Sequence, residues 1–169
     1  MSTAPLLHVA LYEPLIPQNT GNIGRLTTAN QLALHLIGPL GFDVDAKAVR
    51  RAGLDYWKHA DVRLHDGYSD FREAIGPRRI LALSKRADAR YSDAQFRPGD
   101  CLLFGKETTG LPASVLESPD VEPLRLPMRC ALVRSLNLAN AVAITVYEAL
   151  RQLDFPPGDG EPPKLRAAP

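Results

Sequence analysis

The sequence is poor in several features that would indicate a specialised class of protein. It holds only two cysteines in 169 residues, and Cys101 and Cys130 are too far apart for a C-x-x-C site. We expect both to be inert, buried thiols of a cytoplasmic protein. No apolar run reaches the length of a membrane span, and the N-terminus lacks the basic and apolar regions of a signal peptide, so we expect no membrane association.

Several catalytic motifs are missing as well. The chain has no G-x-G-x-x-G, no G-x-x-x-x-G-K-[ST] and no G-x-S-x-G, which argues against a Rossmann dinucleotide site, a P-loop and a hydrolase nucleophile elbow. The four histidines show no metal-ligand spacing with cysteine or carboxylate partners, so no metal site is predicted. His8 and His35 lie in apolar segments and are predicted to be satisfied core residues.

Neither sign of charge is in clear excess, because the net charge is only +1. The basic residues are fifteen arginines and five lysines, and the basic excess lies within residues 25–91. Arginine suits bidentate contacts with phosphate, but the codon usage of a GC-rich genome would produce the same bias. The charge therefore permits a nucleic-acid partner without requiring one.

What the chain does contain is a regular alternation of apolar runs and helical patterns. We expect strands at 8–12, 34–37, 62–64, 79–83, 100–104 and 124–126, and helices at 19–34, 45–52, 68–75 and 135–153. Nearly continuous apolar strands that alternate with helices predict an α/β fold with a single, mostly parallel sheet and flanking helices. The folded domain is assigned to residues 1–154, and the proline-rich residues 155–169 are expected to be a disordered tail.

Three polar, glycine-containing or helix-opening segments follow predicted strands, where ligands of parallel sheets bind. They are PQNTGNIGR at 17–25, FGKETTGLP at 104–112, and LPM at 126–128 with RSLNLAN at 134–140. Each has an ordinary interpretation: a helix capped by Asn19 or Thr20, a loop that faces water, and a long helix capped by Ser135.

Taken in their order, however, the three segments resemble the SPOUT RNA methyltransferases, over residues from about Val9 to Leu153. Within that superfamily the chain is most similar to the small tRNA (cytidine/uridine-34)-2′-O-methyltransferases, which the stretch RRAGLDYW at 50–57 also fits. The resemblance implies a trefoil-knotted fold, a homodimer and S-adenosylmethionine as methyl donor. The implied reaction is 2′-O-methylation of the wobble pyrimidine, position 34, in the anticodon stem-loop of tRNA.

The resemblance also implies roles for individual residues. It places a set of residues at the cofactor: Leu83, Gly105, Gly110, Leu126, Met128, Ser135 and Leu136. Gly105 and Gly110 would let the backbone approach the ligand closely. At the reacting centre it places Arg25, Asn19, Glu107 and Asn137. Because a guanidinium has a pKa above ~12, orienting a phosphate is an easier role for Arg25 than acting as a base. Arg134 and Tyr147 are implied as substrate contacts, with a solvated arginine and a buried core tyrosine as the alternatives.

Rival interpretations differ in what they predict. The last long helix would pack at a dimer interface by resemblance, or inside a monomer. Alternative functions are a SPOUT enzyme acting on another tRNA or rRNA position, a non-catalytic knotted dimer that binds RNA, and a flavodoxin-like phosphate-binding domain. Appended RNA-binding domains are usual in the first alternative, and the chain is short for one. The joint presence of Asn19, Arg25, Glu107, Ser135 and Asn137 argues against a decayed site.

Overall fold

A single six-stranded parallel sheet forms the centre of the protein. The computed structural model describes residues 4–44 and 57–158. The strands are β1 (His8–Tyr12), β2 (Ala33–Ile37), β3 (Asp61–His65), β4 (Ile80–Leu83), β5 (Cys101–Phe104) and β6 (Val121–Leu124). They are arranged in the order β3-β2-β1-β5-β4-β6, and every neighbouring pair is parallel. The predicted α/β fold with a mostly parallel sheet is confirmed, whereas the knot stays a prediction from the resemblance.

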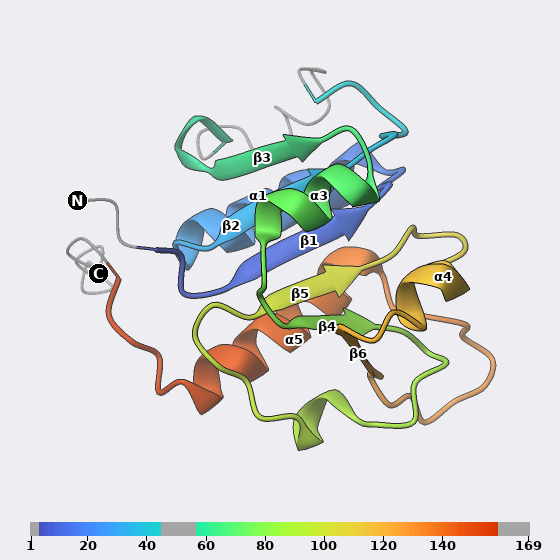
Figure 1. Cartoon of the computed structure of the whole chain (residues 1–169). Helices are drawn as coiled ribbons and strands as arrows, with labels where there is room; N and C mark the ends of the chain where they lie inside the picture. The colour runs from blue at the N-terminus through green and yellow to red at the C-terminus, as the bar shows by residue number, and fades with distance from the viewer. Residues whose placement is uncertain (1–3, 45–56, 159–169) are drawn as a thin grey trace, which may run out of the picture.

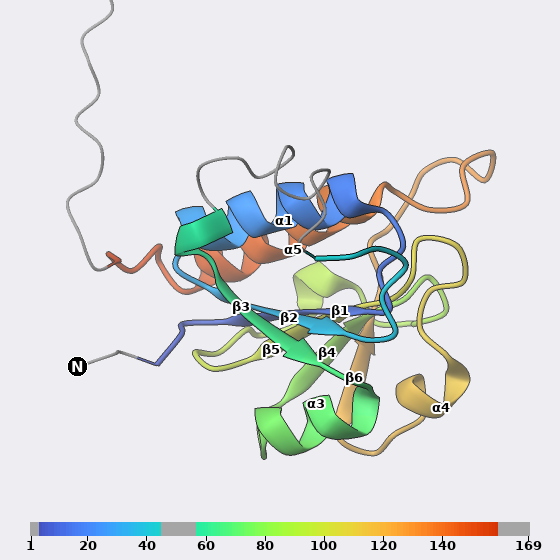
Figure 2. The ribbon, with the colours of Figure 1, turned by 90° about the horizontal axis from the view of Figure 1, so that it is seen from above.

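Helices cover both faces of this sheet. They are α1 (Pro17–Ala29), α3 (Tyr68–Ile75), α4 (Ala113–Leu116) and α5 (Leu138–Gln152), with two short 3-10 helices, η1 (Trp57–His59) and η2 (Tyr91–Asp93). Figure 1 and Figure 2 show α1 and α5 together on one face, and α3 and α4 on the other. The helix predicted at 45–52 lies outside the described residues, as do most of RRAGLDYW and most of the predicted tail.

Two apolar layers explain why the four inner strands, β1, β2, β4 and β5, are almost uninterrupted apolar runs. One layer packs β1, β2 and β5 against α1 and α5, with Ile23, Val142 and Val146 fully buried. The other packs the opposite face of the strands against α3 and α4, with Phe71 and Val115 at its centre. A strand covered on both faces has no solvent-facing positions, so polar alternation disappears. Within the described residues, no helix combines the length and apolar character needed to cross a bilayer.

Several element boundaries differ from the prediction. Helix α1 begins at Pro17 rather than residue 19, because the fixed φ of proline suits a first helical turn. Helix α5 begins at Leu138, and its N-cap is Asn137, whose side chain accepts hydrogen bonds from the backbone N–H groups of Ala139 and Asn140. The prediction that Ser135 caps this helix is therefore wrong. Strand β6 ends at Leu124 instead of beginning there, and it tolerates an internal proline because it is an edge strand.

Three histidines form a buried row across β1, β2 and β3. His8 Nδ1 lies 3.0 Å from His35 Nε2, and His35 Nδ1 lies 2.9 Å from His65 Nε2. At the outer end, His65 Nδ1 lies 3.6 Å from a carboxylate oxygen of Asp70. Both predicted core histidines are buried and hydrogen-bonded, although His8 Nε2 has no partner among the described residues. Burial lowers the pKa of His8 to about 4 and that of His35 to about 3.

The two cysteines differ from one another. Cys101 is buried in β5, and burial raises the pKa of its thiol to about 12. Cys130 is exposed in the loop before α5, so the expectation of two buried thiols is wrong for this residue. Nowhere in residues 4–44 and 57–158 do three or more His, Cys, Asp or Glu side chains gather as metal ligands would.

Candidate functional site

The topology indicates one place for a ligand, at the carboxyl ends of the two central strands. Strands β1 and β5 are neighbours at the centre of the sheet. After β1 the chain passes to α1 on one face, and after β5 it passes to α4 on the opposite face (Figure 2). The two connections diverge, which leaves a crevice outside the carboxyl ends of these strands. Two of the three predicted ligand-binding segments, at 17–25 and 104–112, flank this crevice.

Glu107 joins the two sides of the crevice. Its carboxylate accepts hydrogen bonds from the backbone N–H of Leu15 at 2.9 Å and of Ile16 at 3.1 Å. It also accepts one from the side-chain Nδ2 of Asn19 at 3.1 Å. Hydrogen bonds to an ionised acceptor are stronger than those between neutral groups. A single carboxylate after β5 therefore fixes the course of the chain after β1.

Asn19 extends this connection to the last helix. Asn137 donates from Nδ2 to the Oδ1 of Asn19 at 3.0 Å, while its own Oδ1 caps α5. Glu107, Asn19 and Asn137 thus form one continuous chain of hydrogen bonds, which we call the three-loop network. It joins the segments after β1, after β5 and before α5. The structure brings together three of the four residues that the resemblance places at the reacting centre.

A second tie across the crevice was not predicted from the sequence. The ammonium of Lys106 pairs with the carboxylate of Glu13, and this hydrogen bond raises the pKa of Lys106. Glu13 has a φ of 46°, a conformation that costs energy for a residue with a side chain. The strained residue stands at the end of β1, directly at the crevice. Since its partner is remote in sequence, no local pattern could have identified it.

Gly105 and Gly110 shape the loop after β5. A Cβ on Gly105 would lie 2.2 Å from the carbonyl carbon of Gly110 and 2.3 Å from the amide nitrogen of Leu111. Gly110 has a φ of +71°, which favours glycine, and its N–H donates to the carbonyl of Lys106 at 3.0 Å. The path of the loop itself thus requires both glycines. The predicted close approach to a ligand stays a prediction.

These segments surround a cavity of about 360 Å³. All seven residues predicted for the cofactor line it: Leu83, Gly105, Gly110, Leu126, Met128, Ser135 and Leu136. The three-loop network and Arg134 line it too, together with residues that sequence reasoning did not select, including Ile16, Ser84, Lys85, Arg86, Phe104, Leu111 and Leu138. The lining thus combines apolar side chains at or after strand ends, such as Leu83, Phe104 and Leu126, with the polar loop after β5.

Two predicted residues lie away from this cavity. Arg25 is exposed on α1, beyond the turn that carries Asn19, and is not part of the described lining. Tyr147 on α5 is 50% exposed, with its ring centroid 6.4 Å from that of Phe155, so the alternative of a buried core tyrosine is wrong. The cavity of this chain is consequently assembled without either side chain.

Comparisons with known proteins agree with this geometry. Residues 6–147 match the model of the SpoU rRNA Methylase family. The chain is 47% identical over 152 residues to the tRNA (cytidine(34)-2'-O)-methyltransferase of Escherichia coli, covering 89% of this chain and 96% of that protein.

Solved structures show the same similarity. One, described as giving structural insights into the 2-OH methylation of C/U34 on tRNA, matches with a TM-score of 0.85 and 49% identity, over 90% of this chain and 99% of the other. The SpoU methyltransferase AviRb from Streptomyces viridochromogenes, in complex with the cofactor AdoMet, matches with a TM-score of 0.73 and 27% identity, over 90% of this chain and 60% of AviRb. The chain with this cavity at the β1/β5 crevice belongs to the SpoU methylase family.

Proposed function

We propose that the protein transfers a methyl group from S-adenosylmethionine to the ribose 2′-hydroxyl of the pyrimidine at position 34 of tRNA. The observation that carries this proposal is the three-loop network around the cavity. It occurs in a chain that matches tRNA (cytidine(34)-2'-O)-methyltransferases over almost their whole length. Fold alone would not be sufficient support, because one fold can host many activities.

The cavity suits the cofactor in size and in the chemistry of its walls. About 360 Å³ lies within the usual range of small-molecule sites. Leu83 and Leu126 would flank the flat adenine, with Met128 and Leu136 adding apolar wall. The loop from Gly105 to Leu111, together with Ser135, would hold the ribose and the methionine part. When bound, S-adenosylmethionine supplies an electrophilic methyl group carried on a sulfonium.

The residues of the chain then have to position the attacking hydroxyl and control its proton. In-line placement of reacting groups gives a large part of the acceleration of such a displacement. Glu107 accepts hydrogen bonds from three donors, and Asn137 is committed to Asn19 and the α5 cap. We assign to them the ordering of the reacting centre instead of proton transfer. Arg25 would orient the phosphate next to the attacking hydroxyl.

We also propose that the active form is a homodimer. Helices α1 and α5 lie side by side on one face of the sheet, and α5 carries the exposed apolar side chains of Ile144 (40% exposed) and Tyr147 (50% exposed). A second copy packed on this face would cover them. Arg25, which lies outside the cavity of its own chain, would then serve the RNA held in the partner's cavity.

The test of the activity uses labelled S-adenosylmethionine and tRNA that lacks 2′-O-methylation, with the modified nucleotide mapped. Label on the ribose of a position-34 pyrimidine supports the proposal. Label at another tRNA position or in rRNA would contradict the substrate assignment, and cofactor binding without label in any RNA would contradict the activity.

The shared-site arrangement has a separate test. Chains with Arg25→Ala and chains with Glu107→Gln are each expected to be nearly inactive alone. Mixed and allowed to exchange subunits, they should regain a fraction of wild-type activity, because one site in the mixed dimer is intact. No recovery despite proven subunit exchange would mean that Arg25 and Glu107 act in the same chain.

A further inference from the structure

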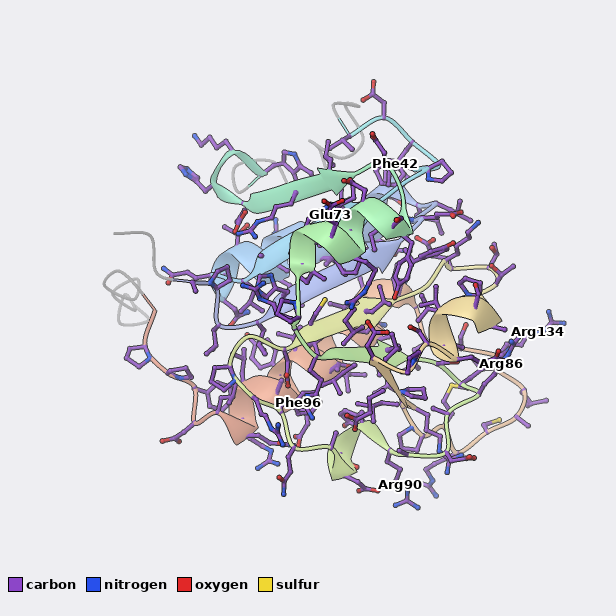
Figure 3. All side chains as sticks on the ribbon, in the orientation of Figure 1. Phe42, Glu73, Arg86, Arg90, Phe96 and Arg134 are labelled. Carbon is purple, nitrogen blue, oxygen red and sulfur yellow. The ribbon has the colours of Figure 1, made fainter. Side chains whose placement is uncertain are left out.

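The mouth of the cavity carries three cationic side chains that the three-loop network does not use. Lys85 and Arg86 come from the segment 84–90, which we call the β4–η2 loop, and Arg134 comes from the loop before α5. All three line the cavity and are exposed. None of the ion pairs formed within the described residues involves them. Figure 3 shows Arg86 and Arg134 on the same side of the molecule.

The β4–η2 loop is anchored at both ends, so it presents its cations from a fixed backbone. Ser84 N–H donates to the carbonyl of Leu124 at 2.8 Å, and Arg125 N–H donates to the carbonyl of Ala89 at 2.8 Å. Inside the loop, the N–H of Arg86 donates to the Oγ of Ser84 at 3.2 Å. Ala87, which follows Arg86, is only 6% exposed. A backbone that is already ordered loses less entropy when its side chains bind a ligand.

The negative charges near this mouth leave its cationic character in place. Glu107 is the acidic residue of the cavity lining, and it is held by three donors. Asp88 belongs to the same loop as Arg86 and is exposed, and Glu117 lines a smaller cavity of about 190 Å³ that Arg86 also borders. The mouth therefore joins a cavity with a mixed apolar and polar lining to exposed cationic side chains on two loops.

The chemistry of the substrate gives this rim a ligand. In RNA, the carbon that carries the 2′-hydroxyl is bonded to the carbon that carries the 3′-phosphate. An enzyme that brings a 2′-hydroxyl to the cavity therefore brings a phosphate to its mouth. Two arginines on two loops that border the same cavity can bind the phosphate oxygens through paired N–H donors, and a lysine adds a point charge.

We propose that Lys85 and Arg86 of the β4–η2 loop, together with Arg134, bind the RNA phosphate that adjoins the methylated ribose, the same phosphate that Arg25 of a second copy would orient. This inference rests on the proposed function, and it adds Lys85 and Arg86 as positioning residues for the RNA. Their contribution is to substrate binding and orientation, whereas the methyl donor would be bound by the walls described above.

The test compares Arg86→Gln, Arg86→Lys and Lys85→Gln with the wild type. A matched control is Arg97→Gln, which removes the same charge from an exposed arginine in the loop that precedes β5, at the opposite end of the strands. Binding of a synthetic anticodon stem-loop RNA is measured over a series of salt concentrations, alongside S-adenosylmethionine affinity, KM for the RNA and kcat.

We expect Arg86→Gln to weaken RNA binding by about tenfold and to reduce the slope of log K against log salt by roughly 0.7, the value for one single-strand phosphate contact. KM for the RNA should rise more than kcat falls, with cofactor affinity unchanged. Arg86→Lys should restore the salt slope but only part of the affinity, because lysine makes no bidentate contact. Lys85→Gln should have a smaller effect of the same kind.

Three results would overturn the inference. They are an unchanged RNA affinity in Arg86→Gln, a loss of cofactor affinity without a loss of RNA affinity, and an equal effect of Arg97→Gln, which would indicate net charge alone. These results differ from failure of the proposed function, in which the wild-type protein itself would neither bind the stem-loop nor methylate it.

Discussion

The buried row formed by His8, His35 and His65 predicts how the free energy of unfolding depends on pH. The folded-state pKa values of His8 and His35, about 4 and about 3, lie below the ordinary value of 6.5. Near pH 5 the unfolded chain therefore binds protons that the folded chain excludes. The stability contributed by these neutral rings is fully present above the unfolded pKa, and it is lost as the pH falls below that value toward the folded pKa values.

The hydrogen-bond pattern explains why the folded state resists protonation. We assign the proton of His65 to Nδ1, because that nitrogen lies 3.6 Å from a carboxylate oxygen of Asp70. With this tautomer, His65 Nε2 would accept from His35 Nδ1, and His35 Nε2 would accept from His8 Nδ1. The only free position is the lone pair of His8 Nε2, which is buried with no partner among the described residues. An added proton there would create a buried N–H and a buried charge without an acceptor.

The size of the effect follows from linkage. Each ring that is protonated only in the unfolded state contributes up to about 1.4 kcal/mol per pH unit, so the pair contributes up to about 2.8 kcal/mol per unit. Against a typical unfolding free energy of about 5–15 kcal/mol, a fall from about pH 6 to about pH 5 is a large loss. Carboxylates with lowered pKa values, such as Glu148 at about 2, lose their contribution only below their own unfolded pKa near 4.5. The interval above about pH 5 therefore isolates the histidines.

The assay is urea unfolding of the wild type and of two variants between about pH 8 and about pH 5. His8→Leu removes one titrating ring and its unpartnered nitrogen, so the slope of unfolding free energy against pH should fall by roughly half. His59→Gln changes an exposed histidine of η1 and should leave the slope unchanged. A wild-type stability that does not vary across this interval would refute the reasoning, as would a slope that depends on His59 instead of His8.

Three further predictions concern the site. Glu107→Gln removes the charge that holds Leu15, Ile16 and Asn19, so the free energy of unfolding should fall by about 2–4 kcal/mol and activity should largely disappear. Thermal unfolding and methyl transfer measure the two effects, with Glu117→Gln as the exposed control. Gly105→Ala places a Cβ in backbone atoms, so cofactor binding in calorimetry should be lost, while Gly67→Ala, which meets nothing within 4 Å, should bind normally. Asn137→Ala removes the α5 cap and the bond to Asn19, which should cost about 1–2 kcal/mol in urea unfolding, and Asn140→Ala should cost less.

Much of the sheet could be predicted because apolar composition is a local signal. Buried strands such as β1 and β5 are continuous apolar runs, and α3 was predicted with its observed bounds, Tyr68–Ile75. Strand β6 was misplaced because Pro123 lowers the strand signal of its own segment, and only the position at the sheet edge makes that proline acceptable. Edge position is a property of the topology, which no single segment reveals.

The candidate site was also predictable in part. Its residues could be predicted because three motifs occur in the same order as in a known family. The contacts between these residues could not be predicted. Two of the three partners of Glu107 are backbone N–H groups, which every non-proline residue has, so no side-chain pattern identifies them. The pair of Glu13 and Lys106 depends on two segments that meet only in the folded sheet. The position of Arg25 outside the cavity likewise follows from the helix geometry of α1 and not from the motif.

The three-loop network has a consequence for the order in which a newly made chain becomes functional. Synthesis proceeds from the N-terminus, so Asn19 and Glu107 leave the ribosome well before Asn137 and α5. The six strands precede α5 in the sequence, but the cavity lining is complete only when that helix packs on the sheet and its cap reaches Asn19. A chain interrupted before Asn137 therefore lacks part of the cavity lining and the last member of the three-loop network, so ligand binding in this cavity would report that translation had passed the final helix.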